Sequence, residues 1–486
     1  MSKEQSIKKN FVFKLLYQVL SVITPLITAP YAARVLGADG IGTYSYTSSL
    51  MAYFTMFAAL GSVNYGTREI AQCRDDKHKV SKTFWEIELL TVVTTIVSLL
   101  GWLILVHFDK RNELYLMALV PLLLATAADI SWLYTGLEMV QYTVVWNMVC
   151  KVLGVVFLLL LIKTKDDLVL YIFITSMIQL FGNISMWIYL PKLLESIHVK
   201  ELHVLKHLKQ TFKYFITSVA ISVYTILDKT MIGLITKDSF QNGYYEQANK
   251  IIGMVKPFAF SAINDVMTPR MSYLFAKEKI EEIKRRINRS LDIELTLSIG
   301  ATFGIFAVSS SFVPIFFGDG YEPVVQLLQM MSFILIPICV STCTGSHYYL
   351  PSGNVVQGTK LTLVGSVLNL SCNAPLICFF GAKGATVASL LAETVIAVLY
   401  MFGCKNYLNL PHIAMSTGKK VLAGCLMLAA VLCVDNIVIS NGVVKLATQV
   451  AIGMITYLLI LIVLKDSSVV EVFALVKERM AKKWQK

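Results

Sequence analysis

The sequence predicts an all-α integral membrane protein with about fourteen transmembrane helices. Hydrophobic residues make up 56% of the 486 positions and charged residues only 15%, whereas soluble domains carry about 25% charged residues. The apolar residues form unbroken runs of about 20 residues, which is the length a helix needs to cross a bilayer. Lys and Arg gather in alternate loops between these runs. The composition therefore excludes a disordered chain and an ordinary soluble enzyme.

The apolar runs define the predicted helices in order. The first run, 11–33, follows a polar, basic start and is too long for the apolar part of a signal peptide, so we expect it to be retained. The remaining predicted spans are 41–65, 84–107, 114–135, 143–162, 168–190, 212–236, 247–271, 291–315, 323–349, 360–380, 384–404, 419–439 and 443–464. An even number of spans places both termini on the same side of the membrane.

A weak internal repeat divides the spans into two lobes. The motif Gly-x-Tyr opens the second span at 42–44 and the eighth span at 243–245. Asn, Thr and Arg follow about one span later, within 64–68 and 264–270. Chance similarity between short motifs is the alternative. Six helices return the chain to the same side, so the lobes would be parallel repeats about an axis normal to the membrane. The predicted parts are a lobe at 1–205, a lobe at 206–410, and two further helices with a basic cytoplasmic tail at 411–486.

The positive charges predict the orientation. Of the 43 Lys and Arg residues, 30 lie on the side of the N-terminus, nine on the opposite side and four within spans; Lys419 and Lys420 are counted among the first group. This asymmetry places both termini in the cytoplasm and the chain in the inner, cytoplasmic membrane. It also explains the net charge of +12, so no nucleic acid partner is expected. The longest loop has about 21 residues, too short for a catalytic domain, which favours a transporter over an enzyme.

Charged residues within spans are the first candidates for a functional site. A charge at the centre of a membrane helix costs at least about 2.5–3.5 kcal/mol and usually faces a cavity. Lys151, Lys256 and Glu393 lie near the middle of predicted spans, too deep to reach the headgroups easily. A structural ion pair between Lys256 and Glu393 is the alternative to separate functional roles.

Four more cations lie nearer the membrane surfaces. Arg34 and Lys229 are predicted toward the outer side, where their side chains could instead extend to the headgroups. Arg68 and Arg270 are predicted at the cytoplasmic ends of their helices, where the alternative role is to anchor the helix. Together with Lys151 and Lys256, these cations predict a cavity for an anionic substrate, most simply a phosphate.

Three acidic residues are candidates for ion coupling: Glu393, Asp228 and Asp129. The chain has no phosphate-binding motif with Lys followed by Ser or Thr, so an ion gradient rather than ATP is expected to drive transport. Either H⁺ or Na⁺ could be the coupling ion. A buried carboxyl group can exchange protons, whereas Glu393 beside Lys256 would stay ionised as its partner.

The cysteines predict neither disulfides nor a metal site. There are nine, an odd number, and most lie in apolar runs. Cys339 and Cys343 are one helical turn apart, but no His or acidic partner is expected in register, and the seven histidines form no metal-binding spacing. We therefore expect both thiols to fill apolar space, with no metal and no cofactor.

Two stretches resemble a known family. Residues 28–44 read TAPYAARVLGADGIGTY, similar to the end of the first helix and the following Gly-x-Tyr in Wzx-type polysaccharide flippases of the multidrug/oligosaccharidyl-lipid/polysaccharide (MOP) exporter superfamily. Residues 228–233 through 243–245 resemble the seventh and eighth helices of that family. The layout agrees over the whole chain, and the specific residue matches fall mainly in 24–74 and 224–272.

The resemblance implies a function that composition alone does not. Members of the family export an undecaprenyl-pyrophosphate-linked oligosaccharide by alternating access of a cationic cavity between two lobes. They serve capsule, O-antigen or exopolysaccharide assembly, with a polysaccharide polymerase and a chain-length regulator as possible partners. A teichoic-acid or lipid II flippase is a close alternative. A drug antiporter of the same superfamily usually has twelve spans and an acidic cavity, and a polymerase usually has a large outer loop that is not found here.

Overall fold

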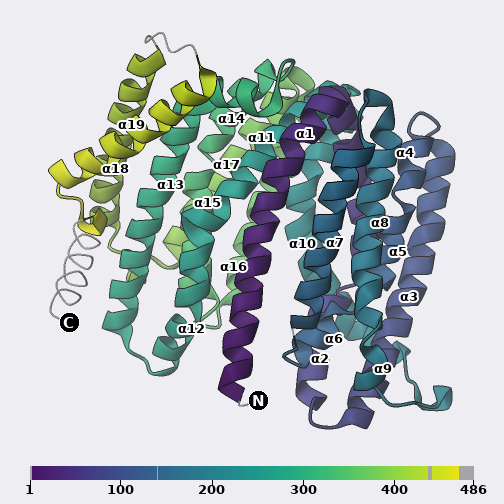
Figure 1. Cartoon of the computed structure of the whole chain (residues 1–486). Helices are drawn as coiled ribbons and strands as arrows, with labels where there is room; N and C mark the ends of the chain where they lie inside the picture. Colours follow the sequence, from purple (N-terminus) through teal and green to yellow (C-terminus); the bar gives the residue numbers. More distant parts are fainter. Residues whose placement is uncertain (1–2, 140, 436–440, 470–486) are drawn as a thin grey trace. The chain divides into compact units, whose positions relative to one another are not determined.

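The computed structural model of the chain is built from α-helices. It describes residues 3–139, 141–435 and 441–469, and these contain no β-strand (Figure 1). The chain forms two compact units, Met1–Gly233 with Asp238–Gly243, and Leu234–Lys237 with Tyr244–Lys486. The three-part division at 205/206 and 410/411 stays a prediction.

The first unit contains the first ten helices. They are α1 (Lys3–Ala59), α2 (Ser62–Cys73), α3 (Lys77–Phe108), α4 (Glu113–Ala118), α5 (Val120–Ala127), α6 (Ser131–Gly136), α7 (Gln141–Leu161), α8 (Leu168–Trp187), α9 (Leu190–Leu193) and most of α10 (Leu205–Thr236). Its hydrophobic core includes one cluster around Trp102 and one around Trp132. Trp102 is fully buried and donates to the carbonyl oxygen of Leu116 at 3.1 Å. Trp132 stacks on Phe84 with ring centroids 5.4 Å apart.

The first two predicted spans are two helical stretches that meet at a kink. The spans 11–33 and 41–65 lie in α1, which is kinked at Gly37 with φ 70° and ψ 174°. Only glycine adopts such a backbone conformation without strain, so the kink falls at the glycine of the family motif. The helix ends at Ala59, before the predicted boundary at 65, because Leu60 and Gly61 both take positive φ and turn the chain into α2.

The glycines of the repeated Gly-x-Tyr motif touch each other. The first turns of α11 (Ser239–Lys256) pack on α1, with Gly42 against Gly243. A Cβ atom on Gly42 would lie 1.7 Å from the carbonyl oxygen of Ser239, and one on Gly243 would lie 2.0 Å from that of Ala38. Any side chain at either position would therefore push the two helices apart. The internal repeat itself stays a prediction.

The second unit contains the remaining helices. They are most of α11, η3 (Pro257–Ser261), α12 (Ala262–Ala276), α13 (Ile280–Phe317), α14 (Glu322–Ser332), α15 (Leu335–Thr344), η4 (Gly345–Tyr349), α16 (Val355–Phe380), α17 (Ala382–Gly403), α18 (Leu410–Asp435) and α19 (Gly442–Val463). Both η3 and η4 are π-helical turns. Pro257 lacks a backbone N–H and crowds the preceding turn, which accounts for the wider turn at η3.

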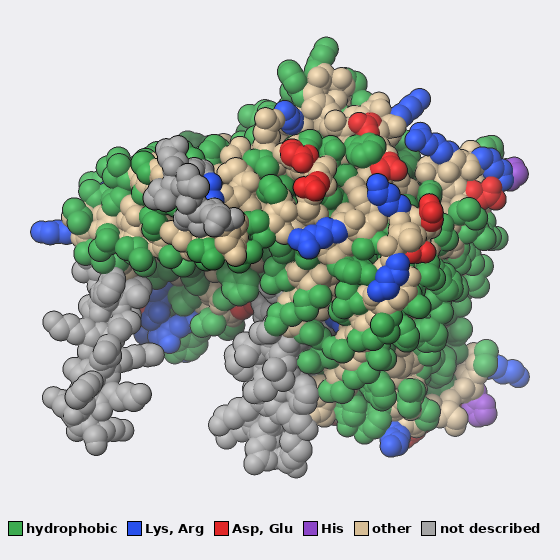
Figure 2. Space-filling view, turned by 45° about the horizontal axis from the view of Figure 1, so that its top comes forward, with side chains coloured by type: hydrophobic (Ala, Val, Ile, Leu, Met, Phe, Trp, Pro, Cys, Tyr) green, Lys and Arg blue, Asp and Glu red, His purple; other side chains and the backbone are tan. Residues whose placement is uncertain are grey.

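The membrane class is confirmed by the helices. Within the described residues, ten helical segments are long and apolar enough to cross a membrane. Many of their apolar side chains face outward, for example Leu100, Ile104 and Leu160, which are about 60% exposed, as expected for contact with lipid. Figure 2 shows broad hydrophobic faces with few charges. The predicted spans 11–33, 41–65, 212–236 and 247–271 are not among the ten, so the count of fourteen stays a prediction.

Candidate functional site

The deepest cation of the first unit is hydrogen-bonded to the first helix. Lys151 lies on α7 and is half-buried. Its Nζ donates to Ser21 Oγ of α1 at 2.9 Å. This contact with a neutral hydroxyl positions the ammonium group of Lys151 beside α1. Arg34 is exposed on α1, one turn before the kink.

The second cation of this unit lies where α10 packs on α1. Lys229 is half-buried, and its neighbour Asp228 is buried within electrostatic range of Tyr53. The next residue, Thr230, donates to Ser49 Oγ at 2.9 Å. Asn242 of α11 donates through Nδ2 to the backbone oxygen of Lys229 at 3.0 Å. Polar contacts therefore fix this part of α10 against α1 at membrane depth.

Asp129, a candidate for ion coupling, lines a cavity of about 270 Å³ in the first unit, with both polar and apolar side chains around it. Its polar lining comes from α1, α2, α5 and α8 and the residues that follow α5: Ser48, Thr55, Ser62, Thr126, Asp129, Gln179 and Asn183. Asp129 accepts a hydrogen bond from the backbone N–H of Ser131 at 3.0 Å. The buried Glu88 of α3 lies within electrostatic range of Asp129, so the two carboxyl groups repel each other when both are charged.

In the second unit, Lys256 and Glu393 interact electrostatically. Lys256 ends α11, directly before the π-helical turn, and is half-buried. Glu393 lies on α17 and is 8% exposed. The carboxylate lies within electrostatic range of the ammonium group, so the structural pair that the sequence suggests is geometrically reasonable. Their roles in transport stay predictions.

The two surface arginines have protein partners. Arg68 is exposed on α2 and donates to the hydroxyl of Tyr214 at 3.4 Å. Arg270 is exposed on α12 and lies 3.8 Å from a carboxylate oxygen of Glu282. Of the six predicted cations, Arg34, Arg68, Lys151 and Lys229 lie in the first unit, and Lys256 and Arg270 lie in the second. One cavity that holds all six stays a prediction.

The sequence analysis missed a pair of acidic motifs. Residues 86–89 of α3 read EIEL and residues 292–295 of α13 read DIEL. The first acid of each motif pairs with a base from a later helix. Glu86 Oε2 lies 2.7 Å from His207 Nε2 of α10, and both side chains are 2% exposed. The second acids, Glu88 and Glu294, are buried, and their oxygens have no hydrogen-bond partner among the described residues.

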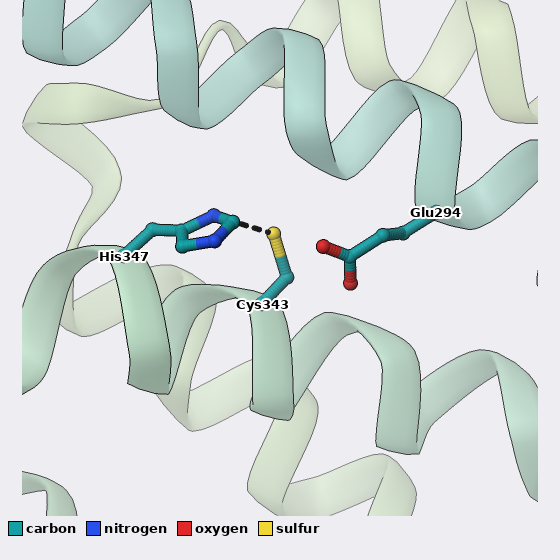
Figure 3. Close-up of side chains that lie close together, drawn as sticks. All are labelled: Glu294, Cys343 and His347. Atoms are coloured by element: carbon teal, nitrogen blue, oxygen red, sulfur yellow. Dashed lines mark hydrogen bonds between the residues drawn. The ribbon is translucent and has the colours of Figure 1, made fainter. Parts of the chain in front are cut away.

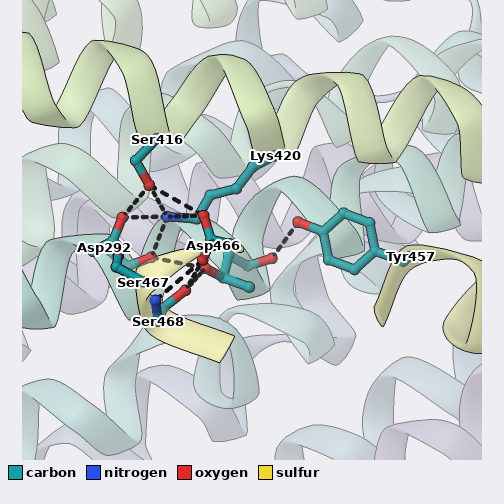
Figure 4. A network of polar contacts seen from close by, with 8 residues as sticks. Asp292, Ser416, Lys420, Tyr457, Asp466, Ser467 and Ser468 are labelled. Carbon is teal, nitrogen blue, oxygen red and sulfur yellow. Dashed lines mark hydrogen bonds and ion pairs between the residues drawn. The ribbon is translucent and has the colours of Figure 1, made fainter. Parts of the chain in front are cut away.

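The structure corrects the predicted location of Lys420. Its place in the sequence predicts a cytoplasmic loop charge, whereas the structure buries it completely within α18. Its Nζ pairs with the carboxylate of Asp292, donates to Ser416 Oγ at 2.7 Å and lies 3.7 Å from Asp466 (Figure 4). Ser467 also donates to Asp292, at 2.7 Å. The Lys420 network therefore ties α13, α18 and the segment after α19 together.

The similar placement of the EIEL and DIEL motifs in their helices is visible in the sequence. Each motif begins about nine to twelve residues into its helix, and each has the same spacing of two acids. The bases that pair with them carry no comparable signal, because His207 and Lys420 differ in residue type and in their surroundings. The expectation that no His lies in register with Cys339 and Cys343 is also wrong, since His347 follows Cys343 by four residues and lies 3.3 Å from it.

Apolar helices of spanning length, with charged side chains placed among them, define a multi-pass membrane protein. Comparison with known families is more specific. The chain belongs to the polysaccharide biosynthesis protein family, whose model matches residues 7–275. This match confirms the family that the motif in 28–44 indicates.

Curated relatives resemble most of the chain. A protein of Escherichia coli (strain K12) named as an O-antigen transporter is 25% identical over 412 residues, which are 82% of this chain and 97% of the relative. A protein of Haloferax volcanii, named as the low-salt glycan biosynthesis flippase Agl15, is 25% identical over 268 residues, which are 52% of this chain and 54% of the relative.

Solved structures show the same fold. The lipid II flippase MurJ in an inward closed conformation has a TM-score of 0.69 at 14% identity, over 94% of this chain and 99% of that chain. An inward-facing multidrug resistance MATE family transporter of the MOP superfamily has a TM-score of 0.63 at 11% identity, over 80% and 94%. These similarities show that the chain shares the fold of these transporters.

Proposed function

We propose that the protein is a flippase that moves undecaprenyl-pyrophosphate-linked oligosaccharide units from the cytoplasmic to the outer leaflet of the inner membrane. The units would supply capsule, O-antigen or exopolysaccharide assembly. The observation that carries the proposal is the family match. A relative named as an O-antigen transporter, which aligns over 97% of its own length, supports it.

Three cations at membrane depth support a pyrophosphate substrate. Lys151 and Lys229 in the first unit and Lys256 in the second are half-buried. An ammonium group binds phosphate as a point charge, and the interaction strengthens where water is excluded. Sugars need hydrogen-bonding groups, and the Asp129 cavity provides hydroxyl, amide and carboxyl side chains. Arg34, Arg68 and Arg270 would attract the headgroup at the two membrane surfaces.

Ion coupling belongs to the same proposal. The substrate's movement would be driven by an H⁺ or Na⁺ gradient, with Glu393, Asp228 and Asp129 as the coupling candidates. Asp228 and Glu393 lie in helices and are buried, and Asp129 lies in the short link between α5 and α6. Both termini would face the cytoplasm. A polymerase and a chain-length regulator would receive the exported unit at the outer surface.

The test is transport of a fluorescent undecaprenyl-pyrophosphate oligosaccharide by the purified full-length protein in vesicles. A membrane-impermeant quencher would measure the fraction that has changed leaflet. Loss of one charge-assisted hydrogen bond is worth about 1.5–3 kcal/mol, so Lys151→Met or Lys256→Met should slow transport about 10- to 150-fold. The Arg variants should retain more activity because they keep the charge. Lys163→Met is the matched control, since Lys163 is exposed at the end of α7.

Three outcomes would refute or redirect the proposal. A wild-type protein that is folded but does not move the lipid-linked oligosaccharide would refute it. Transport of lipid II or of a teichoic-acid precursor instead would select the close alternatives, which the fold of the lipid II flippase makes reasonable. Ion-coupled export of a cationic drug would select the antiporter, which has the fold of the multidrug transporter.

A further inference from the structure

Three metal-binding side chains meet inside the second unit. Glu294 projects from α13, Cys343 from α15 and His347 from the π-helical turn η4 (Figure 3). One ligand atom from each side chain lies within 4.8 Å of the other two. Cys343 Sγ lies 3.3 Å from His347 Nδ1. Figure 3 shows the sulfur between the imidazole ring and the carboxyl group. Among the described residues, this is the one such cluster of three donors.

The cluster is buried but its polar atoms are not satisfied. All three side chains are fully inaccessible to solvent. Both oxygens of Glu294 and Nε2 of His347 have no hydrogen-bond partner among the described residues. Two neighbouring polar atoms, Ser298 Oγ and Asn264 Oδ1, are buried in the same way. Each unsatisfied buried polar group costs about 1–3 kcal/mol, and a charged one costs more. Such a site is therefore incomplete without a ligand.

A divalent soft cation meets these requirements. We propose that Glu294, Cys343 and His347 hold one Zn²⁺ ion. A thiolate and a carboxylate carry two negative charges, which balance Zn²⁺, and the imidazole binds as a neutral ligand. With bonds of about 2.3 Å to sulfur and 2.0–2.1 Å to nitrogen, a tetrahedral ion separates those two atoms by about 3.5 Å. The observed separation of 3.3 Å is close to this value.

The fourth position has two neighbouring donors. Cys339 is fully buried one turn before Cys343, and Asn264 is buried on α12. A second thiolate would add an uncompensated negative charge in a buried site, so the amide oxygen of Asn264 is the better fourth ligand. The ion would then link α12, α13 and the α15–η4 segment. It would stabilise the π-helical turn inside the second unit.

The first unit provides an internal comparison. Glu88 occupies the position in the EIEL motif that Glu294 occupies in DIEL. It lies near Asp129, and no cluster with Cys or His forms there among the described residues. Thus the shared acid alone does not make the site. The Cys-x₃-Cys-x₃-His spacing at 339–347 is what distinguishes the second unit.

The experiment measures metal in the full-length protein, purified in detergent with its affinity tag removed. Elemental analysis after growth with added zinc should find one zinc per chain. After chelation, added Co²⁺ should produce a near-ultraviolet charge-transfer band, because a thiolate bound to Co²⁺ absorbs there and a carboxylate or water ligand does not. Cys343→Ser should abolish the band, and Glu294→Gln should weaken Co²⁺ binding at least tenfold. Cys425→Ser, which removes an exposed thiol, is the matched control and should change nothing.

The wild-type protein alone can overturn the proposal. If Cys343 only donates a hydrogen bond to His347, a monodisperse preparation will contain no stoichiometric zinc and will give no thiolate–Co²⁺ band. Retention of the band in Cys343→Ser would equally exclude the site. Because neither readout depends on transport, failure here would leave the flippase proposal unchanged.

Discussion

Replacing Lys420 by Met should destabilise the second unit more than any other single change in its polar core. The side chains are similar in length, so the substitution removes the charge with little change in volume. It leaves Asp292 and Asp466 buried without their shared cation. Asp292→Asn is milder, because Lys420 keeps Asp466 at 3.7 Å and Ser416 at 2.7 Å.

The expected magnitudes follow from burial. Lys420 is fully buried and Asp466 is 1% exposed, so solvent cannot screen the charges that remain. Removing one partner of a buried ion pair costs about 3–5 kcal/mol. Asp292→Asn also removes one partner of a buried pair, but Lys420 keeps Asp466 as a counter-charge, so we expect the smaller cost of losing one charge-assisted hydrogen bond, about 1.5–3 kcal/mol. We therefore expect the free energy of unfolding to fall more for Lys420→Met than for Asp292→Asn.

The buried thiols of the second unit report this loss directly. Cys339, Cys343 and Cys404 are buried, and they become reactive toward a fluorogenic thiol reagent when the unit unfolds. The melting temperature from this signal should decrease in the order wild type, Asp292→Asn, Lys420→Met. Lys419→Met is the matched control, since this adjacent lysine is only half-buried and lies outside the network.

An unchanged melting temperature in Lys420→Met would refute the reasoning. The same conclusion would follow if Asp292→Asn were the more damaging variant, because the effect would then come from packing around the carboxylate rather than from loss of a shared cation. A double-mutant cycle with both substitutions measures the coupling energy, which should exceed about 0.5 kcal/mol for residues in contact.

Three further predictions concern coupling, topology and packing. If Glu393 carries the coupled proton, Glu393→Gln should still bind the lipid-linked oligosaccharide but lose its dependence on a proton gradient in vesicles; gradient-driven transport at the wild-type rate would exclude it. In a background without native cysteines, Lys279→Cys should react with an impermeant thiol reagent only after lysis and Asp319→Cys in intact cells, and the reverse pattern would invert the orientation. Gly243→Ala should lower the free energy of unfolding by about 1–3 kcal/mol through overpacking, and therefore lower the melting temperature. Gly253→Ala should leave the melting temperature unchanged, because a Cβ atom there faces open space. Equal melting temperatures for the two variants would show that the helices move apart freely.

The sequence predicts the class well because lipid leaves the backbone few choices. Without water to bond to, spanning segments must satisfy their own N–H and C=O groups, so long apolar runs become helices. The kink at Gly37 lies in the gap between two predicted spans, but whether the chain turns or continues there depends on packing. The second predicted span, 41–65, ends earlier, at Ala59, and this boundary also depends on packing.

The polar sites were harder to predict, because their partners lie on other helices. Lys420 stands near a predicted span boundary, where an exposed lysine is common, and only Asp292 and Asp466 explain its burial. The register of His347 with Cys343 is visible in the sequence. The convergence of Glu294 from α13 is not, since it depends on how two helices pack. The roles of the deep lysines depend on a substrate and stay predictions.

Each paired acid is synthesised well before the base that it contacts, because that base lies on a later helix. His207 follows Glu86 by 121 residues, and Lys420 follows Asp292 by 128 residues. Ribosomes add about 5–20 residues per second, so each acid enters the membrane roughly 6–26 s before its base has been made. During that interval the acid lacks the base with which it pairs in the folded protein. The insertion machinery must therefore hold α3, and later α13, in a setting that tolerates a lone acid until α10 or α18 emerges.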